Sequence, residues 1–464
     1  MFSIHVRGRW RSMLGAMMVA PGAIGAASTV GAQQPASAPA KTITFDDALR
    51  IALEQNTAVR QARNTAALNS ATVTQQKLAF LPNLSLSTNT GQSYGRNFSQ
   101  SDGQIVDQTT NTLNAGLSST VTLFDGMRNV ANLKSAQADE RAGEQDLARA
   151  KQSAVFTVAS NFLTLITQQQ QLAVQEQNLA AQEALENQIS QFVKAGSRPV
   201  SDLYQQQANV AAAQAAVVTT HNAVELAKVD LIQTLQLEPR GTYDFRAPVI
   251  PDDAGAGKQF NLDSLLDRAF AQRPDLDAQT SRVEAAQQDV KAAGASKWPT
   301  ISLTGGYNSG VSSASEAAFL DQLNQRRGGS IGIGISLPLF DRGVTAAATE
   351  KAQIQQQNAN LALQTQRQQI ALEVRRAYLD YQAALQQLAA ADAQRKAASL
   401  AVAATQQRYQ VGAATLVEVT QARATQVQAQ SAFINARNNL VFQQSLMSYY
   451  TGELNPSSAA GLLG

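Results

Sequence analysis

The most constraining feature of this sequence is an internal duplication. Pro82 corresponds to Pro299 at a spacing of 217 residues, and Gly196 corresponds to Gly412 at a spacing of 216. Because the spacing hardly changes between these points, the two copies are expected to contain the same elements in the same order, with almost no insertions. Any fold proposed for the chain must therefore accommodate the same unit twice.

Composition marks where the two copies begin and end. The segment between them contains Pro239, Pro248, Pro251, Gly255 and Gly257, which is typical of a linker. The predicted segments are a signal peptide at 1–32, a linker at 33–41, the first repeat at 42–238, an inter-repeat linker at 239–259, the second repeat at 260–454 and a C-terminal tail at 455–464.

The first 32 residues have the features of a secretory signal. Arg7, Arg9 and Arg11 precede an apolar stretch, and small residues follow up to Ala32, so cleavage is expected before Gln33. The whole chain has 37 lysines and arginines and 35 aspartates and glutamates. Removing this segment takes away three arginines and no acidic residue, which leaves a net charge of −1. The mature chain has no excess of positive charge, so nucleic acid is not an expected partner.

Within each copy, the period of the apolar residues changes from helix to strand. Helices are expected at 46–79 and 263–296, each followed closely by a proline. The period then becomes two, as in Ile331, Ile333 and Ile335, which alternate with glycine and serine. The predicted strands are 83–96 and 112–124 in the first copy, and 300–308 and 330–340 in the second, joined by polar loops at about 97–111 and 308–329.

Two long helices complete each copy. Asp125 and Asp341 are suitable N-cap residues, and no helix-breaking residue interrupts the stretch that follows Asp125. A spacing of 3.5 residues predicts left-handed coiled coils. It is clearest at Ala371, Val374, Tyr378, Tyr381, Leu385 and Leu388. The predicted long helices are 126–194 and 200–237 in the first copy, and 342–410 and 415–450 in the second.

One chain cannot form a membrane pore by itself, because four strands leave two unpaired edges and cannot enclose a lumen. Two chains would supply eight strands, which their own side chains fill. Three chains would supply twelve, which leave room for solutes. The predicted fold class is therefore mainly α with a membrane β-barrel, formed by a homotrimer of duplicated units that each contain a helix, a strand pair and a long helical hairpin.

This order of elements resembles the TolC family of outer-membrane efflux proteins. The residues that carry the resemblance are LFDGMR at 123–128, LFDRG at 339–343, RYQVGAATLVEVTQAR at 408–423 and QFVKAGSRPVSDLYQQQA at 191–208. The resemblance covers essentially the whole mature chain. It implies a trimer in contact with outer-membrane lipid, with a twelve-stranded barrel and a twelve-helix periplasmic tunnel. It also implies a passive exit duct that receives small molecules or proteins from a periplasmic adaptor and an inner-membrane transporter.

The long helices reverse at two tips, which are the predicted adaptor-docking sites. These residues are Gly196, Ser197, Arg198, Gly412, Ala413, Ala414 and Thr415. Some relatives carry acidic residues that constrict the tunnel close to the second tip, but the stretch from Ala397 to Tyr409 contains none, so a cation-binding ring is not transferred. Glu186 is instead the candidate acid facing the lumen. Whether the inner-membrane partner is a proton-driven pump or a secretion ATPase is left open.

No catalytic chemistry is expected. Without cysteine, and with His221 as the one histidine after the signal, neither a cofactor nor a metal site is predicted. The Gly91-Gln92-Ser93-Tyr94-Gly95 motif matches the G-x-S-x-G elbow of serine hydrolases, but a polar loop is expected after it rather than a helix. A periplasmic hydrolase that uses this motif is one alternative function, although the sequence supplies no catalytic base for it. A soluble periplasmic coiled-coil adaptor or scaffold is the other.

Overall fold

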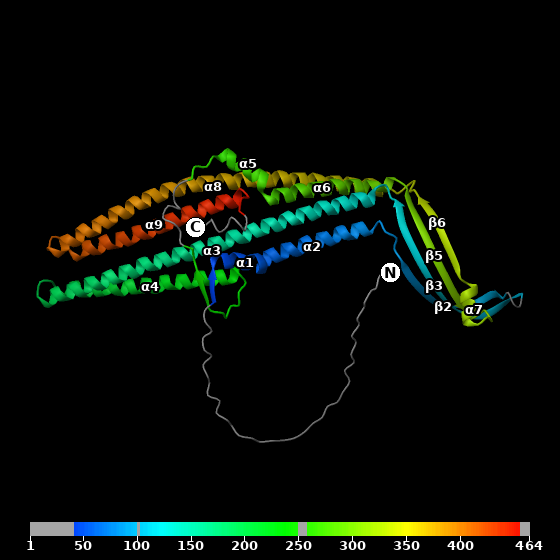
Figure 1. Ribbon diagram of the computed structural model, residues 1–464, viewed down its shortest axis with the longest axis horizontal. Helices are drawn as coiled ribbons and strands as arrows, with labels where there is room; N and C mark the ends of the chain where they lie inside the picture. Colours follow the sequence, from blue (N-terminus) through cyan, green and yellow to red (C-terminus); the bar gives the residue numbers. More distant parts are fainter. Residues whose placement is uncertain (1–40, 100–102, 249–257, 455–464) are drawn as a thin grey trace, which may run out of the picture. The chain divides into compact units, whose positions relative to one another are not determined.

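The structure is a computed structural model, and it describes residues 41–99, 103–248 and 258–454. Three predicted segments lie outside the described residues: the signal peptide at 1–32, the linker at 33–41 apart from Lys41, and the tail at 455–464. Both repeats are described, apart from short gaps. Figure 1 shows their elements in chain order.

The first repeat runs from a short strand to a long helical hairpin. Its elements are β1 (Lys41–Thr44), α1 (Phe45–Gln55), α2 (Thr57–Leu78), β2 (Ser85–Ser99), β3 (Gln104–Phe124), α3 (Arg128–Lys194) and α4 (Val200–Thr234). The second repeat follows the same plan with two additional short helices, the 3-10 helix η1 and α7. Its elements are β4 (Tyr243–Arg246), α5 (Leu262–Gln272), α6 (Pro274–Gly294), η1 (Ala295–Lys297), β5 (Thr300–Ser312), α7 (Phe319–Gln325), β6 (Gly328–Ser336), α8 (Val344–Gln410) and α9 (Leu416–Tyr450).

The expected helices at 46–79 and 263–296 are each divided in two, so the prediction of one continuous helix was wrong. In the first repeat, Asn56 leaves the helical conformation and its Oδ1 accepts hydrogen bonds from the amides of Ala58 and Val59. In the second repeat, Arg273 is extended because Pro274 follows it. Both helices therefore restart with a new N-cap, which allows the chain to change direction.

The first strand hairpin is longer than predicted, and the expected polar loop at 97–111 is mostly strand. Pairing between β2 and β3 continues to Ser99 and Gln104. Polar composition was misleading here because both strands satisfy their backbone hydrogen bonds across the pair, whatever their side chains. In the second repeat, β5 continues to Ser312, and α7 occupies part of the expected loop at 308–329.

The four long strands form one antiparallel sheet in the order β2-β3-β5-β6. The two repeats join in its centre, where β3 pairs with β5 from Thr112–Ser312 to Phe124–Ile301. The edges are β2, from the first repeat, and β6, from the second. A second, parallel pair is formed by β1 and β4. Strand β4 lies within the predicted linker at 239–259, whereas β1 begins at the last residue of the linker at 33–41 and continues into the first repeat.

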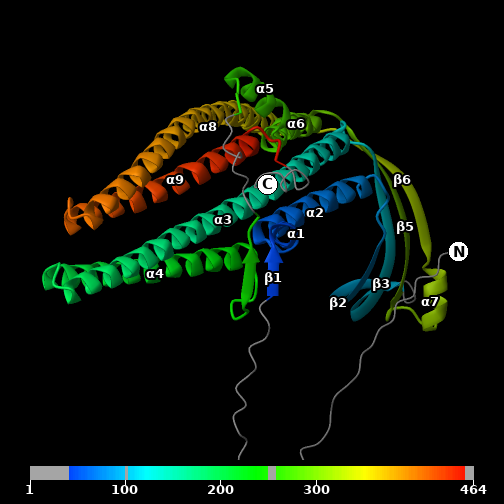
Figure 2. The same ribbon diagram turned by 60° about the vertical axis from the view of Figure 1, so that its left-hand side comes forward.

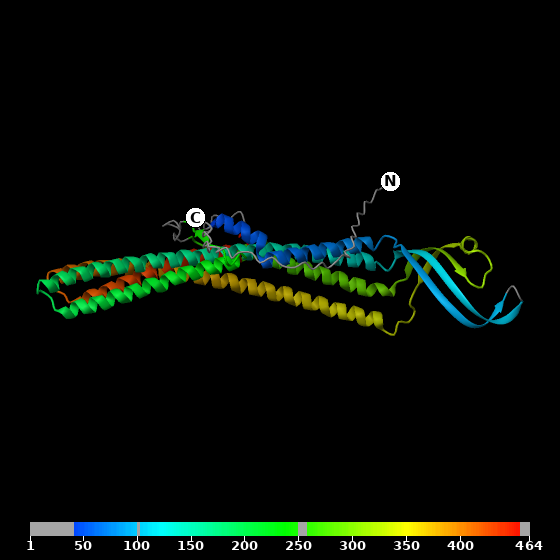
Figure 3. The ribbon, with the colours of Figure 1, turned by 90° about the horizontal axis from the view of Figure 1, so that it is seen from below.

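Helix α3 occupies the centre of the helical part. It packs against α1, α2, α4, α6 and α9, whereas α8 packs against α5, α6 and α9. Figures 2 and 3 show α3 beside α4, and α8 beside α9, along the two hairpins. The ring of Phe162 on α3 makes edge contacts with Phe45 and Phe245, at centroid distances of 5.3 and 6.2 Å. One aromatic side chain thus joins α3, α1 and β4.

The coiled-coil period is present in both repeats, but the second seam is shifted. In α3, the expected Val155, Val158, Phe162 and Leu165 are buried. In α8, the fully buried positions are Ile370, Val374, Ala377, Tyr381 and Ala384. Ala371, Tyr378 and Leu385 follow one position later and are only half-buried. At two of these three positions, the pattern selected a larger side chain, Tyr378 or Leu385, whereas the buried residue is the preceding alanine.

Within the part of the chain that the structure describes, no helix is both long and apolar enough to cross a membrane.

A buried ion cluster fixes the start of α6 against α8. The side chain of Arg273 is only 2% exposed, and its guanidinium donates to Asp275 at 2.6 Å and to Glu373 at 2.7 Å. Arg149 of α3 approaches the same Asp275 carboxylate at 3.9 Å and covers the ring of Tyr449. Burial opposes ionisation of Asp275, but its bonds to Arg273 prevail, so its pKa lies below the ordinary value. The cluster therefore connects α3, α6, α8 and α9.

We expect the substitution Arg273→Met to destabilise the fold by about 3–5 kcal/mol, because it leaves two carboxylates partly buried without their cation. Thermal unfolding in detergent measures this loss. Arg50→Ala is the matched control, since it removes an exposed ion pair with Asp47 and should change stability by less than about 1 kcal/mol. Since the pKa of Asp275 is lowered, its contribution is present near neutral pH and is lost only as the pH falls below about 4. Equal stability of the two variants would contradict this role.

Candidate conduit surfaces

Both helical tips end in the same backbone motif. Gly196 and Gly412 have φ angles of 72° and 79°, in the left-handed region that favours glycine. The amide of Ser197 donates to the carbonyl of Phe192 at 2.9 Å, and that of Ala413 donates to Arg408 at 2.8 Å. This is a Schellman motif, which satisfies the last carbonyls of α3 and α8. A Cβ at either glycine would meet no atom within 4 Å, so backbone conformation rather than space requires glycine.

The predicted tip residues divide into exposed and buried groups. Ser197, Gly412 and Ala413 are exposed, but Ala414 is only 6% exposed. Ala414 lies in an apolar cluster with Leu185, Ile189, Tyr409, Leu416 and Val419. Its side chain is therefore part of the packing within the chain, and its contact with an adaptor stays a prediction. Thr415 forms a capping box with Glu418, which starts α9.

Arg198 connects the tip of the first repeat to that of the second. Its guanidinium lies 4.6 Å from the centre of the Tyr409 ring, and its Nη2 donates to the Tyr409 carbonyl at 3.2 Å. Tyr409 is fully buried, which raises the pKa of its phenol. The two tips of one chain are thus joined by a cation–π contact over an apolar cluster. The sequence placed Arg198 at a tip but did not indicate this partner.

Three further predicted positions lie on α3 or just before a long helix. Glu186 is half-buried on α3, beside the buried Leu185, and its facing the lumen stays a prediction. Asp125 and Asp341 do accept hydrogen bonds from the first turns of α3 and α8, from the amides of Asn129 and Thr345. Each lies three residues before its helix begins, and the N-cap residues themselves are Met127 and Gly343.

The two faces of the β2-β3-β5-β6 sheet differ in polarity. Residues directly opposite each other in an antiparallel sheet share a face. Leu86 pairs with Leu117, which pairs with Tyr307. The same register places the large apolar residues of the strands on this face, among them Leu113, Val121, Ile301, Leu303, Ile331, Ile333 and Ile335. Many of them are exposed in the single chain, with Ile331 at 87%.

The opposite face is formed by small polar residues and glycine. Its members include Ser85, Ser87, Thr112, Gly116, Ser118, Thr120, Thr122, Ser302, Thr304, Ser330, Gly332 and Gly334. An apolar face opposite a polar face is the pattern of strands that separate lipid from a water-filled lumen.

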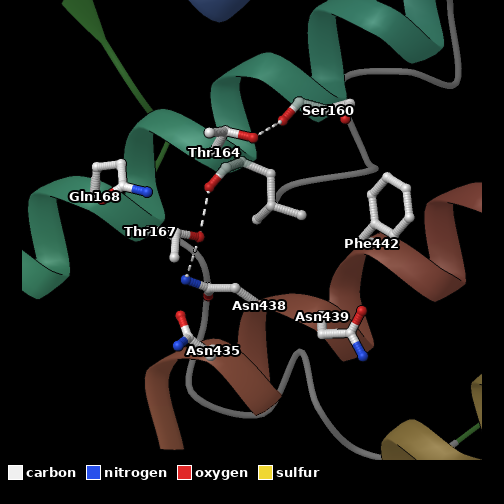
Figure 4. Close-up of a pocket in the computed structure, with 9 residues that line it drawn as sticks. Ser160, Thr164, Thr167, Gln168, Asn435, Asn438, Asn439 and Phe442 are labelled. Carbon is white, nitrogen blue, oxygen red and sulfur yellow. Dashed lines mark hydrogen bonds between the residues drawn. The ribbon is translucent and has the colours of Figure 1, made fainter. Parts of the chain in front are cut away.

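A polar pocket of about 230 Å³ lies between α3 and α9 (Figure 4). Asn438 is 3% exposed and its Nδ2 donates to the hydroxyl of Thr167 at 2.9 Å and to Gln170 at 3.0 Å. Thr167 in turn donates to the carbonyl of Leu163 at 2.7 Å. At this level, the hairpins of the two repeats therefore meet through hydroxyl and amide groups.

The hydrolase motif has no catalytic context. Gly91, Ser93 and Gly95 all lie inside β2, which pairs with β3 on both sides of Ser93, so no strand–turn–helix elbow exists. His221 is exposed on α4. Among the described residues, no group of histidine, aspartate and glutamate could hold a metal ion.

Comparison with known proteins identifies the two repeats. A sequence model described as outer membrane efflux protein matches residues 48–235 and again residues 265–451, one match for each repeat. This chain belongs to the outer membrane efflux protein family. It is an outer-membrane efflux channel with a large periplasmic helical part, and it is a conduit rather than an enzyme.

Two curated relatives illustrate the similarity. The pyoverdine export outer membrane protein OpmQ of Pseudomonas aeruginosa is 25% identical over 394 residues, which cover 82% of this chain and 77% of the relative. The outer membrane protein TolC of Vibrio cholerae is 22% identical over 390 residues, covering 82% and 84%.

The solved structures show the same fold. The outer membrane protein VceC from Vibrio cholerae superposes with a TM-score of 0.75 at 20% identity, over 88% of this efflux protein and 96% of VceC. CusC superposes with a TM-score of 0.76 at 18% identity, over 91% and 95%. The duplicated helix, strand-pair and helical-hairpin plan predicted from the sequence is therefore the fold of TolC-like channels.

We expect Arg198→Ala to loosen both tips, because it removes the contact between Arg198 and Tyr409. A loss of about 1 kcal/mol would raise amide hydrogen exchange around both tips about fivefold. Arg408→Ala is the matched control, since Arg408 donates to the Ala413 carbonyl within its own hairpin. It should affect the second tip alone. Unchanged exchange at the second tip in Arg198→Ala would contradict a link between the hairpins.

Proposed function

We propose that three copies of this efflux protein form a closed ring, in which the second repeat of each chain lies beside the first repeat of the next. The observation that carries the proposal is the pair of open sheet edges. The strand β2 has a partner on one side only, and so has β6. Pairing β6 of one chain with β2 of the next satisfies both edges, and repeating the contact three times closes a barrel of twelve strands.

The helices support the same arrangement. Among the described elements, α8 does not pack against α2 or α4, and it has a free apolar stripe. Its members are Ile354, Leu361, Leu372, Leu379 and Leu400. Free apolar residues also lie on α2 and α4, in the other repeat, at Leu68, Leu78, Val218, Leu226 and Val229. Contact between α8 and the next chain's α2 and α4 would cover both sets. Like the pairing of β6 with β2, it joins the second repeat of one chain to the first repeat of the next.

In this ring, the apolar sheet face contacts outer-membrane lipid and the polar face lines the lumen. The long helices continue the duct on the periplasmic side, with their tips farthest from the sheet. The duct conducts passively. Small molecules or proteins enter it from a periplasmic adaptor and an inner-membrane transporter, with the adaptor contacting the tips. The left-handed turns at Gly196 and Gly412, with exposed small residues beside them, support docking there.

Native mass spectrometry of the mature protein in detergent should give a mass of three chains. Leu379→Asp should shift the population toward monomer. Each of the three interfaces loses about 2 kcal/mol of the free energy gained by burying the leucine side chain, and it gains a desolvated charge. Gln387→Asp introduces the same carboxylate at an exposed polar position of α8 outside the apolar stripe, and should leave the trimer intact. A dimer or monomer that still conducts in planar bilayers would contradict the ring.

The tips are tested by two arginine substitutions at exposed positions. Gly412→Arg strains the left-handed turn, and Ala413→Arg adds bulk beside it without requiring a change in φ. Both should abolish efflux while trimer and surface abundance are retained. Ala414→Arg is unsuitable as a docking test, because it should disrupt the packing of the tip. If Ala413→Arg exports normally at equal abundance and still crosslinks to the adaptor, docking at this tip is excluded.

A further inference from the structure

Charge is distributed unequally between the two sheet faces. The four strands contain only two charged residues, Arg96 and Asp107, and these pair directly with each other on the apolar face. The aromatic residues of the strands lie on that face too, at Tyr94, Phe98, Phe124 and Tyr307. Apart from Val106, the described polar face therefore consists of serine, threonine, asparagine, glutamine and glycine.

Several hydroxyl groups on the polar face bond to groups of the sheet itself. Thr304 donates to the carbonyl of Gly332, its partner on the neighbouring strand, at 3.2 Å. Ser87 and Thr112 reach the carbonyls of Gly116 and Gly91 in the same way, at 3.4 Å. The Ser85 and Ser118 hydroxyls lie 2.7 Å apart. These hydroxyl protons are used between strands and are therefore not free to bind a passing solute.

Packing does not account for the glycine at position 332 of this face. A Cβ at Gly332 would meet the Thr304 hydroxyl at 3.6 Å, which is ordinary van der Waals contact. Alanine would fit there, and it would cost the strand less conformational entropy than glycine. The consequence of glycine is a bare backbone at this position, without a side chain that projects from the polar face.

We propose that the polar sheet face is an uncharged wall, and that the membrane part of the conduit passes anionic and cationic cargo equally. This inference rests on the proposed function, in which the polar face lines the lumen. No fixed charge on the wall concentrates ions of one sign. Selection by charge is then left to the helical part of the duct, where Glu183 and Glu186 lie on α3.

The absence of cysteine from the chain allows a direct test. Single variants Gly332→Cys and Ile333→Cys place a thiol at neighbouring positions of β6 that lie on opposite faces. The proteins are inserted in planar bilayers and treated with a cationic and an anionic methanethiosulfonate reagent. Gly332→Cys should react with both, with a lasting fall in conductance and rates that agree within about threefold after correction for the reagents' reactivity with a free thiol. Ile333→Cys, facing lipid, should keep its conductance.

The double variant Gly332→Cys with Thr304→Asp calibrates the response. A carboxylate opposite the thiol should favour the cationic reagent about tenfold or more. If Gly332→Cys alone already shows such a preference, the wall is charged and this inference is wrong, while the conduit remains. If Ile333→Cys reacts and Gly332→Cys does not, the assignment of the faces is wrong. A protein that never conducts would overturn the proposed function itself.

Discussion

The open backbone at the two sheet edges governs how this protein can exist in a membrane. Along β2 and β6, amide and carbonyl groups face outward without a strand partner. In water these groups would bind solvent, but in hydrocarbon each costs several kcal/mol. A sheet with an apolar face and two open edges is therefore incomplete as a membrane structure. The need to pair these edges leads from the single chain to an assembly.

The duplication explains why one assembly can satisfy the strands and helices together. Each sheet edge comes from a different repeat, and the free apolar stripe of α8 likewise faces away from the repeat that contains α2 and α4. In the proposed ring, one neighbour placed in one direction would cover both sets of open positions. The centre of the chain is held differently, by the core around Phe162 and by the ion cluster around Arg273. These contacts join the two repeats within each subunit.

Much of this architecture follows from the sequence because it depends on local periodicity. Alternation at Ile331, Ile333 and Ile335 indicates a strand. Gly196 and Gly412 indicate the turns at the tips, where both residues have positive φ angles. The break at Asn56 was missed because an asparagine within a helical pattern does not by itself predict a new N-cap. Polar composition likewise concealed how far β2 and β3 remain paired. The contact of Arg198 with Tyr409 joins residues 211 positions apart, which no local pattern can indicate.

The central claim is that β6 of one chain pairs with β2 of the next in a ring of three. Electron cryomicroscopy of the mature protein in lipid nanodiscs tests it most directly, at a resolution that separates strands. The account predicts three chains, twelve strands and a β6–β2 ladder at each of three equivalent contacts, with α8 against the neighbour's α2 and α4. Strands β6 paired with each other, or a sheet that closes with a number of chains other than three, would contradict it.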